Sequence, residues 1–291
     1  MIEGLNKAPI VGFVRYSQKI TFGTERDVFE PNYFEYRFNI FKNVTLESFR
    51  QQNNQNFVLL LLHSENMPSD YKARFLKLEN ENKFLYNVFV KDTQKSFDEA
   101  LINSVHNIDF LNNVAITFRI DNDDAVQNDF IQKLSHFIKT DYEGFSISIP
   151  KQYIVKRITE DDYLLQENYY PANSIGLAYV TSKENYKAVL ELGQHHLTNE
   201  NTPMVLLENS NNGGLMTING ENAINTMDDT KAILYNEKEL YRYLGQKKIT
   251  NIRFDDLRIF KKENRVSLKK ILSLFIPPIL KILTLKVKSL F

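Results

Sequence analysis

Three carboxylates follow directly after one apolar segment of the chain. The segment 113–120 reads NVAITFRI, and Asp121, Asp123 and Asp124 come after it. Like charges at this spacing repel one another and destabilise a fold unless a positive group lies among them. Mg²⁺ and Mn²⁺ prefer oxygen ligands and often take only one or two carboxylates, with phosphate and water as the rest. The spacing therefore favours a divalent cation at Asp121 and Asp123, which would neutralise a departing diphosphate.

A second interpretation of the same aspartates needs no ligand. Apolar residues recur at helical spacing over 123–137, at Ala125, Phe130, Leu134 and Phe137. An aspartate at the start of this predicted helix would cap it and interact favourably with its dipole. Both interpretations stay open at this point. We expect Asp124 to be the cap where Asp121 and Asp123 serve the metal.

Strands and helices that could position the aspartates alternate along the first half of the chain. Apolar runs predict buried strands at the four segments 8–14, 56–66, 84–90 and 113–120. Helical spacing lies between them, over 33–51, from Ser69 onward and over 96–111. This alternation predicts a mostly parallel sheet covered by helices on both faces. Ligands bind outside the carboxyl ends of such strands, which is where the aspartates lie.

The second half of the chain has a different pattern. Partial alternation over 145–158 predicts an antiparallel hairpin, and an apolar segment at 173–182 precedes a predicted helix over 183–192. No linker rich in Pro, Gly or Ser divides the chain. We therefore predict one mixed α/β domain over residues 1–260, with a nucleotide-binding half and a mixed acceptor-side half, followed by an appendage over 261–291.

Composition narrows the possible classes of protein. The 36 basic and 36 acidic residues give a formal charge of zero, so nothing global indicates a nucleic-acid partner. The absence of cysteine excludes disulfides, zinc–thiolate sites and thiol nucleophiles, and it fits a reducing compartment. The N-terminal segment lacks a basic region and a small-residue cleavage site, so we expect no signal peptide and a cytoplasmic protein.

The appendage over 261–291 is both apolar and basic. Lysines recur through it, Glu263 is its one acidic residue, and Pro277 and Pro278 interrupt its apolar run. A membrane-spanning helix needs about 20 mostly apolar residues with few charges, which this segment does not offer. The pattern favours a basic amphipathic tail that lies on the anionic inner face of the plasma membrane. The alternative is a helix packed on the catalytic domain or on a partner.

Several stretches resemble the rhamnosyltransferase family of bacterial GT-A glycosyltransferases. They are residues 37–75, the stretch TFRIDNDDAVQNDFI at 117–131 and, more weakly, NSIGLAYV with QHHL within 173–197. The resemblance implies a GT-A-like fold and a nucleotide-sugar donor. It also implies that Asp121 and Asp123 hold Mn²⁺ or Mg²⁺ against the ribose or diphosphate of that donor.

The resemblance places further donor-binding residues at the end of the first predicted strand. Tyr16 would stack on the nucleotide base there, Arg15 would contact phosphate, and Ser17 belongs to the same donor-binding stretch. The alternative for all three is ordinary surface polarity. Arg37 and Arg74 could neutralise the diphosphate or pair with a nearby glutamate, and we favour a structural role for Arg74.

The resemblance also implies a third metal ligand, commonly a histidine, in the second half of the domain. The family tends to carry it near the stretch at 203–214, where this chain has none. Either His195 or His196 would then substitute, with His196 as our assignment. Otherwise Asp121 and Asp123 act with phosphate and water alone.

The sequence offers three weak candidates for a catalytic base. An inverting transferase needs a carboxylate that deprotonates the acceptor hydroxyl. The candidates in the second half of the chain are Asp161, Asp162 and Glu208, and each could equally be a solvated or structural acid.

Together these patterns predict a metal-dependent glycosyltransferase. It would move a sugar, which the resemblance suggests is rhamnose, from a nucleotide diphosphate to a bacterial surface-polysaccharide acceptor, either a glycan or a lipid-linked glycan. The alternative from another class is a catalytically inactive sugar- or nucleotide-binding protein of the same fold. A nucleotidyltransferase is less favoured, because no glycine-rich basic loop follows the first strand.

Overall fold

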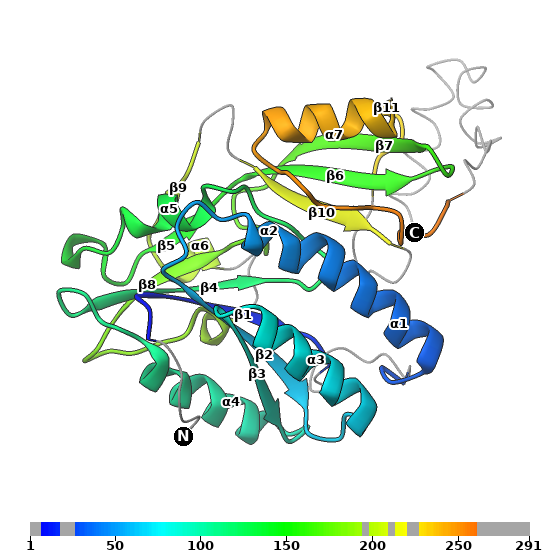
Figure 1. The fold of residues 1–291 in the computed structure, drawn as a ribbon. Coiled ribbons are helices and arrows are strands. Elements are labelled where there is room, and N and C mark those ends of the chain that lie inside the picture. The colour runs from blue at the N-terminus through cyan, green and yellow to red at the C-terminus, as the bar shows by residue number, and fades with distance from the viewer. Residues whose placement is uncertain (1–6, 18–26, 194–197, 209–212, 220–226, 261–291) are drawn as a thin grey trace, which may run out of the picture. The chain divides into compact units, whose positions relative to one another are not determined.

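Two β-sheets with helices packed against them make up the described part of the chain (Figure 1). The structure is a computed structural model that describes residues 7–17, 27–193, 198–208, 213–219 and 227–260. The sheets and helices belong to one compact unit, Met1–Ile259.

The larger sheet has seven strands in the order β3-β2-β1-β4-β8-β5-β9. The four strands β3, β2, β1 and β4 run parallel, β8 is antiparallel to both β4 and β5, and β9 is parallel to β5. The carboxyl ends of all strands except β8 therefore share one edge with the start of β8. The bounds are β1 (Ile10–Arg15), β2 (Val58–Ser64), β3 (Leu85–Val90), β4 (Val114–Ile120), β5 (Ser146–Ser148), β8 (Ala178–Ser182) and β9 (Met204–Leu206).

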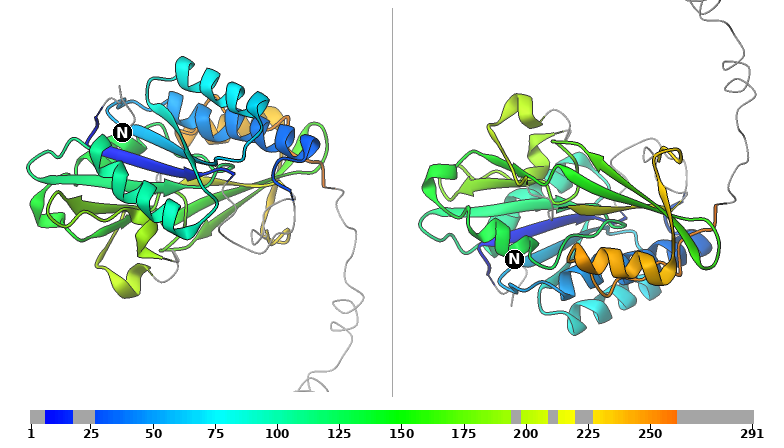
Figure 2. Two further views of the ribbon diagram at one scale, coloured as in Figure 1. Left: turned by 90° about the horizontal axis from the view of Figure 1, so that it is seen from below. Right: turned by 90° about the horizontal axis from the view of Figure 1, so that it is seen from above.

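Helices cover both faces of the larger sheet (Figure 2). On one face lie α1 (Pro31–Ile40), the π-helix η1 (Phe41–Leu46), α2 (Glu47–Arg50), α3 (Ser69–Glu81) and α5 (Phe130–Ser135). On the other face lie α4 (Gln94–Asn103) and the 3₁₀ turn η4 (Val189–Leu192). The short turns η2 (Ser104–Asn107) and η3 (Thr140–Tyr142) and the short helix α6 (Thr198–Asn201) complete this half. The predicted α/β fold with a parallel, doubly covered half-sheet is confirmed.

Continuous apolar strands form the centre of this half. Every residue of β2 and β4 is buried, because helices cover both faces of these strands. Phe34 and Phe38 of α1 pack edge to face with Phe75 of α3, at ring-centroid distances of 6.1 and 5.2 Å. Fully burying one such side chain stabilises the fold by about 1.5–3 kcal/mol.

The smaller sheet has the order β10-β6-β7-β11 and mixes parallel with antiparallel pairs, as predicted for the second half. Its strands are β6 (Lys151–Arg157), β7 (Asp162–Tyr169), β10 (Gly214–Ile218) and β11 (Ile233–Asn236). Helix α7 (Glu237–Gln246) packs on it and begins at a capping box in which the Asn236 and Glu239 side chains satisfy each other's backbone N–H groups. Residues 249–257 add apolar side chains to the same core.

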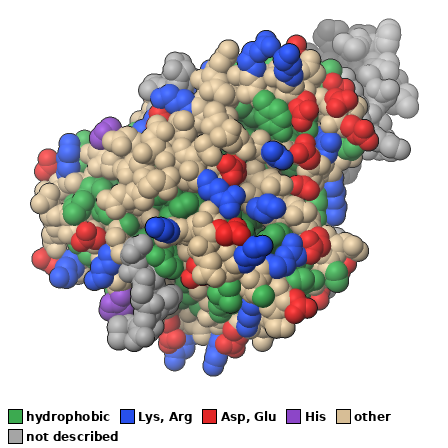
Figure 3. Space-filling view, in the orientation of Figure 1, with side chains coloured by type: hydrophobic (Ala, Val, Ile, Leu, Met, Phe, Trp, Pro, Cys, Tyr) green, Lys and Arg blue, Asp and Glu red, His purple; other side chains and the backbone are tan. Residues whose placement is uncertain are grey.

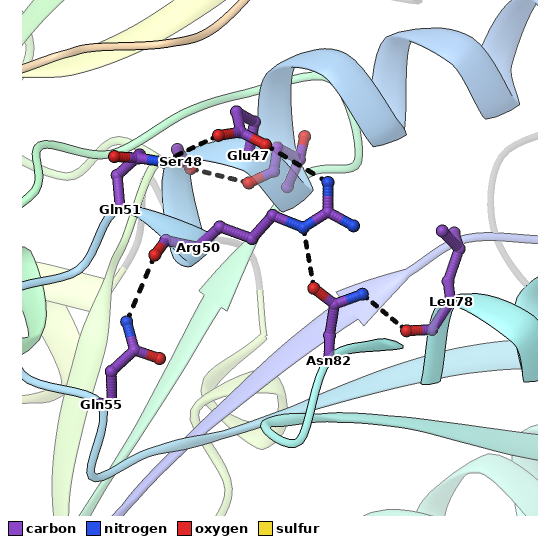
Figure 4. A network of polar contacts seen from close by, with 8 residues as sticks. Glu47, Ser48, Arg50, Gln51, Gln55, Leu78 and Asn82 are labelled. Atoms are coloured by element: carbon purple, nitrogen blue, oxygen red, sulfur yellow. Dashed lines mark hydrogen bonds and ion pairs between the residues drawn. The ribbon is translucent and has the colours of Figure 1, made fainter. Parts of the chain in front are cut away.

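Polar contacts tie the end of α2 to the end of α3 (Figure 4). The Arg50 Nε donates to Asn82 Oδ1 at 2.8 Å, and the Asn82 amide donates to the Leu78 carbonyl at 2.6 Å. Arg50 also pairs with Glu47 at 3.3 Å. These residues therefore fix the packing of two helices that cover one face of the larger sheet.

The predicted helix over 123–137 is wrong except for its last part. Helix α5 begins only at Phe130, and Asp124 caps nothing. Residues 121–129 form turns because the backbone of Ala125 pairs with Leu215 of β10, with both N–H···O distances at 2.8 Å. Ala125 is buried in the core of the smaller sheet. Its apolar side chain therefore packs in that core and does not mark one face of a helix.

Three other sequence predictions are also corrected. Residues 145–158 do not form a hairpin, because β5 pairs within the larger sheet while β6 pairs within the smaller one. The predicted helix over 183–192 is only the turn η4, since the hydroxyls of Thr181 and Thr117 accept the N–H groups of Lys187 and Val189. The helix predicted over 96–111 ends at Asn103.

No helix within the described residues is long and apolar enough to cross a membrane. The tail over 261–291 lies outside the described residues, so its predicted amphipathic character stays a prediction.

Candidate functional site

The carboxyl ends of β1 and β4 bring two arginines and one aspartate together. The Arg119 Nη2 donates to Asp121 Oδ1 at 3.4 Å, and the Ser174 side chain also hydrogen-bonds to Asp121. Gly176 fixes the loop that carries Ser174, because its N–H donates to the Arg119 carbonyl at 3.0 Å. Arg15 ends the neighbouring strand and interacts electrostatically with the same aspartate.

Asp121 is an ionised carboxylate in this environment. Burial raises the pKa of Asp121, but the charges of Arg119 and Arg15 and the hydrogen bond from Ser174 together lower it more, so the net pKa lies below its ordinary value. Burial and Arg119 also lower the pKa of the Arg15 guanidinium. The Asp121 side chain is 43% exposed, whereas that of Arg119 is only 9% exposed. Asp121 therefore orients the two arginines and remains accessible to a ligand.

Asp123 lies against the end of β10. Its Oδ2 accepts a hydrogen bond from the Asn219 amide at 2.8 Å, and its backbone carbonyl accepts one from the Thr217 hydroxyl at 2.9 Å. Burial and then the charge of Asp121 raise the pKa of Asp123 to about 6, against an opposing effect of Arg37. The smaller sheet thus orients a carboxylate whose negative charge is only partly compensated.

Asp124 is the least compensated of the three carboxylates. Its side chain is 1% exposed, and its Oδ1 has no hydrogen-bond partner among the described residues. Burial, then Asp123 and Asp121, raise the pKa of Asp124 well above its ordinary value, while Arg119 lowers it. The neighbouring Asn122 is also buried, with an amide nitrogen that lacks a partner in the described chain.

These residues fit a hard divalent cation. They offer carboxylate and amide oxygens, which are the ligands of Mg²⁺ and Mn²⁺, and burial together with the neighbouring carboxylates raises the pKa of both Asp123 and Asp124. No group of three or more His, Asp or Glu side chains converges within the described chain, so phosphate and water would have to complete the shell. His195 and His196 lie outside the described residues.

The structure gives Tyr16 and Ser17 structural roles. The Tyr16 ring is 4% exposed and packs in the aromatic core, 4.7 Å from the Phe75 ring, so the predicted stacking of Tyr16 on a nucleotide base is wrong. Burial raises the pKa of the Tyr16 hydroxyl. Ser17 is also buried, and its hydroxyl accepts the N–H of Ser64 at 3.3 Å, which ties the end of β1 to β2.

The two predicted diphosphate candidates of the 37–75 stretch, Arg37 and Arg74, have different surroundings. Arg37 lies over the rings of Tyr33 and Tyr16, at 5.5 and 5.4 Å, and lowers the pKa of Asp123 through its charge. Arg74 pairs with Glu35 and lies 4.0 Å from the ring of Phe38. Arg37 is therefore available to the site, and Arg74 joins α3 to α1.

Two of the predicted base candidates lie where the turn after β6 meets β7: Asp161 in the turn and Asp162 as the first residue of β7. The Thr159 hydroxyl donates to Asp162 Oδ2 at 3.0 Å, and the Asp161 carbonyl accepts the N–H of Glu237 at 2.8 Å. These contacts shape the turn and attach it to the start of α7.

The third candidate, Glu208, follows β9 at the shared edge of the larger sheet. Its carboxylate accepts a hydrogen bond from the Tyr169 hydroxyl. Both residues line a cavity of about 230 Å³ that also includes Pro150, Lys151 and Leu207. Glu208 is thus the candidate that the topology places at the same strand edge as the aspartates.

Sequence reasoning missed four residues of this site: Arg119, Ser174, Thr217 and Asn219. Arg119 could have been found, because residues two apart on a strand share a face and Asp121 follows it at that spacing. Ser174 lies within a stretch that resembles the family. Nothing in the sequence pairs Thr217 or Asn219 with Asp123, because the contact joins segments 94 and 96 residues apart.

The chain belongs to the family described as "Putative rhamnosyl transferase", which matches residues 10–232. The matched range contains Arg15, Arg119, Asp121, Asp123 and Asn219. A comparison with curated proteins finds no match.

Solved structures similar to this chain include TarS residues 1–349 of Staphylococcus aureus, with 12% identity and a TM-score of 0.42 over 72% of this chain and 60% of that one. TarS 1–349 in complex with UDP-GlcNAc has 10% identity and a TM-score of 0.38, over 77% and 61%. A nucleoside-diphosphate-sugar pyrophosphorylase of Vibrio cholerae has 11% identity and a TM-score of 0.32, over 72% and 91%. This chain thus spans about three fifths of the length of the TarS structure.

The crowded carboxylates predict that a divalent cation stabilises the protein more at neutral than at acidic pH. The pKa of Asp123 is raised from 3.8 to about 6, so its contribution to stability is fully present below about pH 4 and is lost as the pH rises through about 6. That loss is at most about 3 kcal/mol. A cation that takes the place of the proton restores this lost stability. The Mn²⁺-induced rise in Tm should therefore be larger at about pH 7.5 than at about pH 5.

The matched control is Asp123→Asn, which has no charge to offset. In this variant the Mn²⁺-induced rise in Tm should no longer be larger at about pH 7.5 than at about pH 5. Equal Tm shifts at both pH values in the unaltered protein, or a larger shift at the higher pH in the variant as well, would contradict the assignment.

Proposed function

We propose that the protein is a metal-dependent glycosyltransferase. It moves a sugar, rhamnose by its family membership, from a nucleoside-diphosphate donor to a bacterial surface-polysaccharide acceptor, either a glycan or a lipid-linked glycan. One observation carries the proposal: the Asp123 carboxylate, oriented by Asn219, lies beside the arginine-paired Asp121 at the carboxyl edge of a parallel half-sheet. This is the position at which parallel α/β sheets bind their ligands.

The roles within the proposed donor site follow from charge. Arg15 and Arg119, oriented by Asp121, face the negative charge of the donor at the end of β1 and β4. Arg37 supplies a third cation on the side of Asp123. Mn²⁺ or Mg²⁺ at Asp123, when bound, supplies Lewis-acid neutralisation of the departing diphosphate.

The transfer itself exchanges one bond for another at C1 of the sugar. The acceptor hydroxyl oxygen bonds to C1 and gives up its proton to a carboxylate base, for which Glu208 is the candidate at this strand edge, while the bond from C1 to the diphosphate oxygen breaks. The bonding electron pair leaves with the nucleoside diphosphate. Fixed positive charge near that oxygen stabilises the transition state more than the ground state, because negative charge develops there.

Donor turnover by a conservative variant tests this proposal. Asp123→Asn keeps the shape of the side chain and removes its charge, so hydrolysis or transfer of a nucleotide sugar should fall by about 10²-fold or more. Chelation of divalent cations should have the same effect on the unaltered protein. Asp141→Asn, which changes an exposed carboxyl group elsewhere, is the control and should retain full turnover.

Turnover would be assayed over a panel of nucleotide sugars that includes dTDP- and UDP-linked donors. Full activity of Asp123→Asn would refute the role of Asp123. Nucleotide binding without turnover of any donor, in the unaltered protein with Mn²⁺, would instead favour the inactive binding protein of the same fold.

The sequence of residues 261–291 supports a second element of the proposal, peripheral association with the inner face of the plasma membrane in the cytoplasm. The described part of the molecule shows basic and acidic side chains interspersed over one face (Figure 3), whereas lysines dominate the charges of the tail. Each lysine near an anionic surface adds about 1 kcal/mol of attraction, which salt weakens.

Vesicle co-sedimentation of the full chain tests this membrane association. We expect binding to phosphatidylserine-containing vesicles at low salt and a marked loss at high salt. Replacing Lys269, Lys270 and Lys281 by Gln should weaken binding, because three surface charges are removed. Binding that ignores salt and lysine number, or no binding to anionic vesicles, would contradict this part of the proposal.

A further inference from the structure

Three hydrogen bonds link the C-terminal part of the described chain to Asp123. The backbone N–H of Arg258 donates to the Tyr36 hydroxyl at 3.3 Å, and that hydroxyl donates to the Asn219 carbonyl at 2.6 Å. The Asn219 amide then donates to Asp123 Oδ2 at 2.8 Å. The bonds join segments far apart in sequence: α1, the end of β10 and the loop after β4.

Tyr36 is fixed in this chain of bonds from two directions. Its hydroxyl accepts one hydrogen bond and donates another, so both of its bonding capacities have partners. Its ring lies 4.7 Å from the Arg258 guanidinium, which packs over it. Rotation of the side chain would break all of these contacts, and the hydroxyl therefore has one orientation.

Asn219 depends on Tyr36 for its own orientation. It is 5% exposed and comes directly after β10, where the ladder of the smaller sheet ends at Ile218. Its backbone carbonyl bonds to Tyr36, and its side-chain amide bonds to Asp123. Loss of the Tyr36 hydroxyl would leave this carbonyl without that donor and free the residue that orients the carboxylate.

The segment that contains Arg258 is itself anchored to the fold. We call residues 249–258 the C-terminal strap. The N–H of Arg253 donates to the Asn43 carbonyl at 3.0 Å, and the N–H of Phe254 donates to the Tyr241 hydroxyl at 3.1 Å. The strap, coloured orange in Figure 1, runs past the end of β10 and α1. It therefore holds Tyr36 from a segment that is itself hydrogen-bonded to η1 and α7.

We propose that Tyr36 is a positioning residue for the cation site, which it orients through Asn219 and Asp123 from the C-terminal strap. The inference rests on the proposed function, since it assigns Tyr36 to the same site. It adds a residue on α1 that touches neither donor nor cation, and it connects the site to the segment directly before the tail.

Two tyrosine variants provide a matched test. Tyr36→Phe keeps the ring over Arg258 and removes only the hydroxyl. Tyr241→Phe removes a hydroxyl that likewise accepts a backbone N–H of the strap but has no bond to Asn219 or Asp123. Each variant removes a hydroxyl that accepts an N–H of the strap, so an effect found in Tyr36→Phe alone reports on the bond to Asn219.

The first readout is the affinity for Mn²⁺ alone, from the electron paramagnetic resonance signal of the free ion during titration. Outer-shell partners of a metal ligand change affinity by about 10- to 100-fold, so Tyr36→Phe should weaken Mn²⁺ binding about tenfold. Tyr241→Phe should bind Mn²⁺ as the unaltered protein does. Equal effects of the two variants, or none in Tyr36→Phe, would overturn the positioning role.

The second readout is independent of the cation. The side-chain amide resonance of Asn219, assigned by its loss in Asn219→Asp, should shift or broaden in Tyr36→Phe and stay unchanged in Tyr241→Phe. If the unaltered protein does not bind Mn²⁺, the cation part of the proposed function fails and this resonance alone decides about Tyr36. An unmoved Asn219 amide in Tyr36→Phe would then refute the inference.

Discussion

Mutual repulsion among three carboxylates is the constraint on which the site depends. Asp121, Asp123 and Asp124 follow one buried strand within four residues, and the described residues compensate them unequally. Two arginines offset Asp121 and lower its pKa, whereas burial and neighbouring charge raise the pKa of Asp123 to about 6 and that of Asp124 well above its ordinary value. Such an arrangement costs stability in the absence of a cation, which is common at functional sites.

The fold maintains this arrangement by joining its two sheets at the aspartate loop. Ala125 pairs with Leu215, the Thr217 hydroxyl bonds to the Asp123 carbonyl, and the Asn219 amide bonds to its carboxylate. The larger sheet thus supplies the strand ends and the arginines, and the smaller sheet sets the direction of Asp123. This division explains why a site on a parallel half-sheet needs the mixed half of the domain.

The sequence predicted the parallel half well, because its strands are continuous apolar runs separated by helical spacing. The prediction failed where the same residue fits two different structural environments. Ala125 fits a helical pattern but is buried by pairing with β10, and Tyr16 follows the end of a strand yet lies in an aromatic core. Asn219 and Tyr36 could not be found, because their roles come from hydrogen bonds between segments distant in sequence, which periodicity does not record.

The central claim is that Asp123 holds a divalent cation together with the diphosphate of a nucleotide. Anomalous diffraction from crystals grown with Mn²⁺ and a bound nucleoside diphosphate tests it most directly. We expect an anomalous peak between the Asp123 carboxylate and the phosphate oxygens, with Arg15 and Arg119 on the side of Asp121. A nucleotide bound at this strand edge with no peak beside Asp123, or with the peak at other residues, would contradict the account.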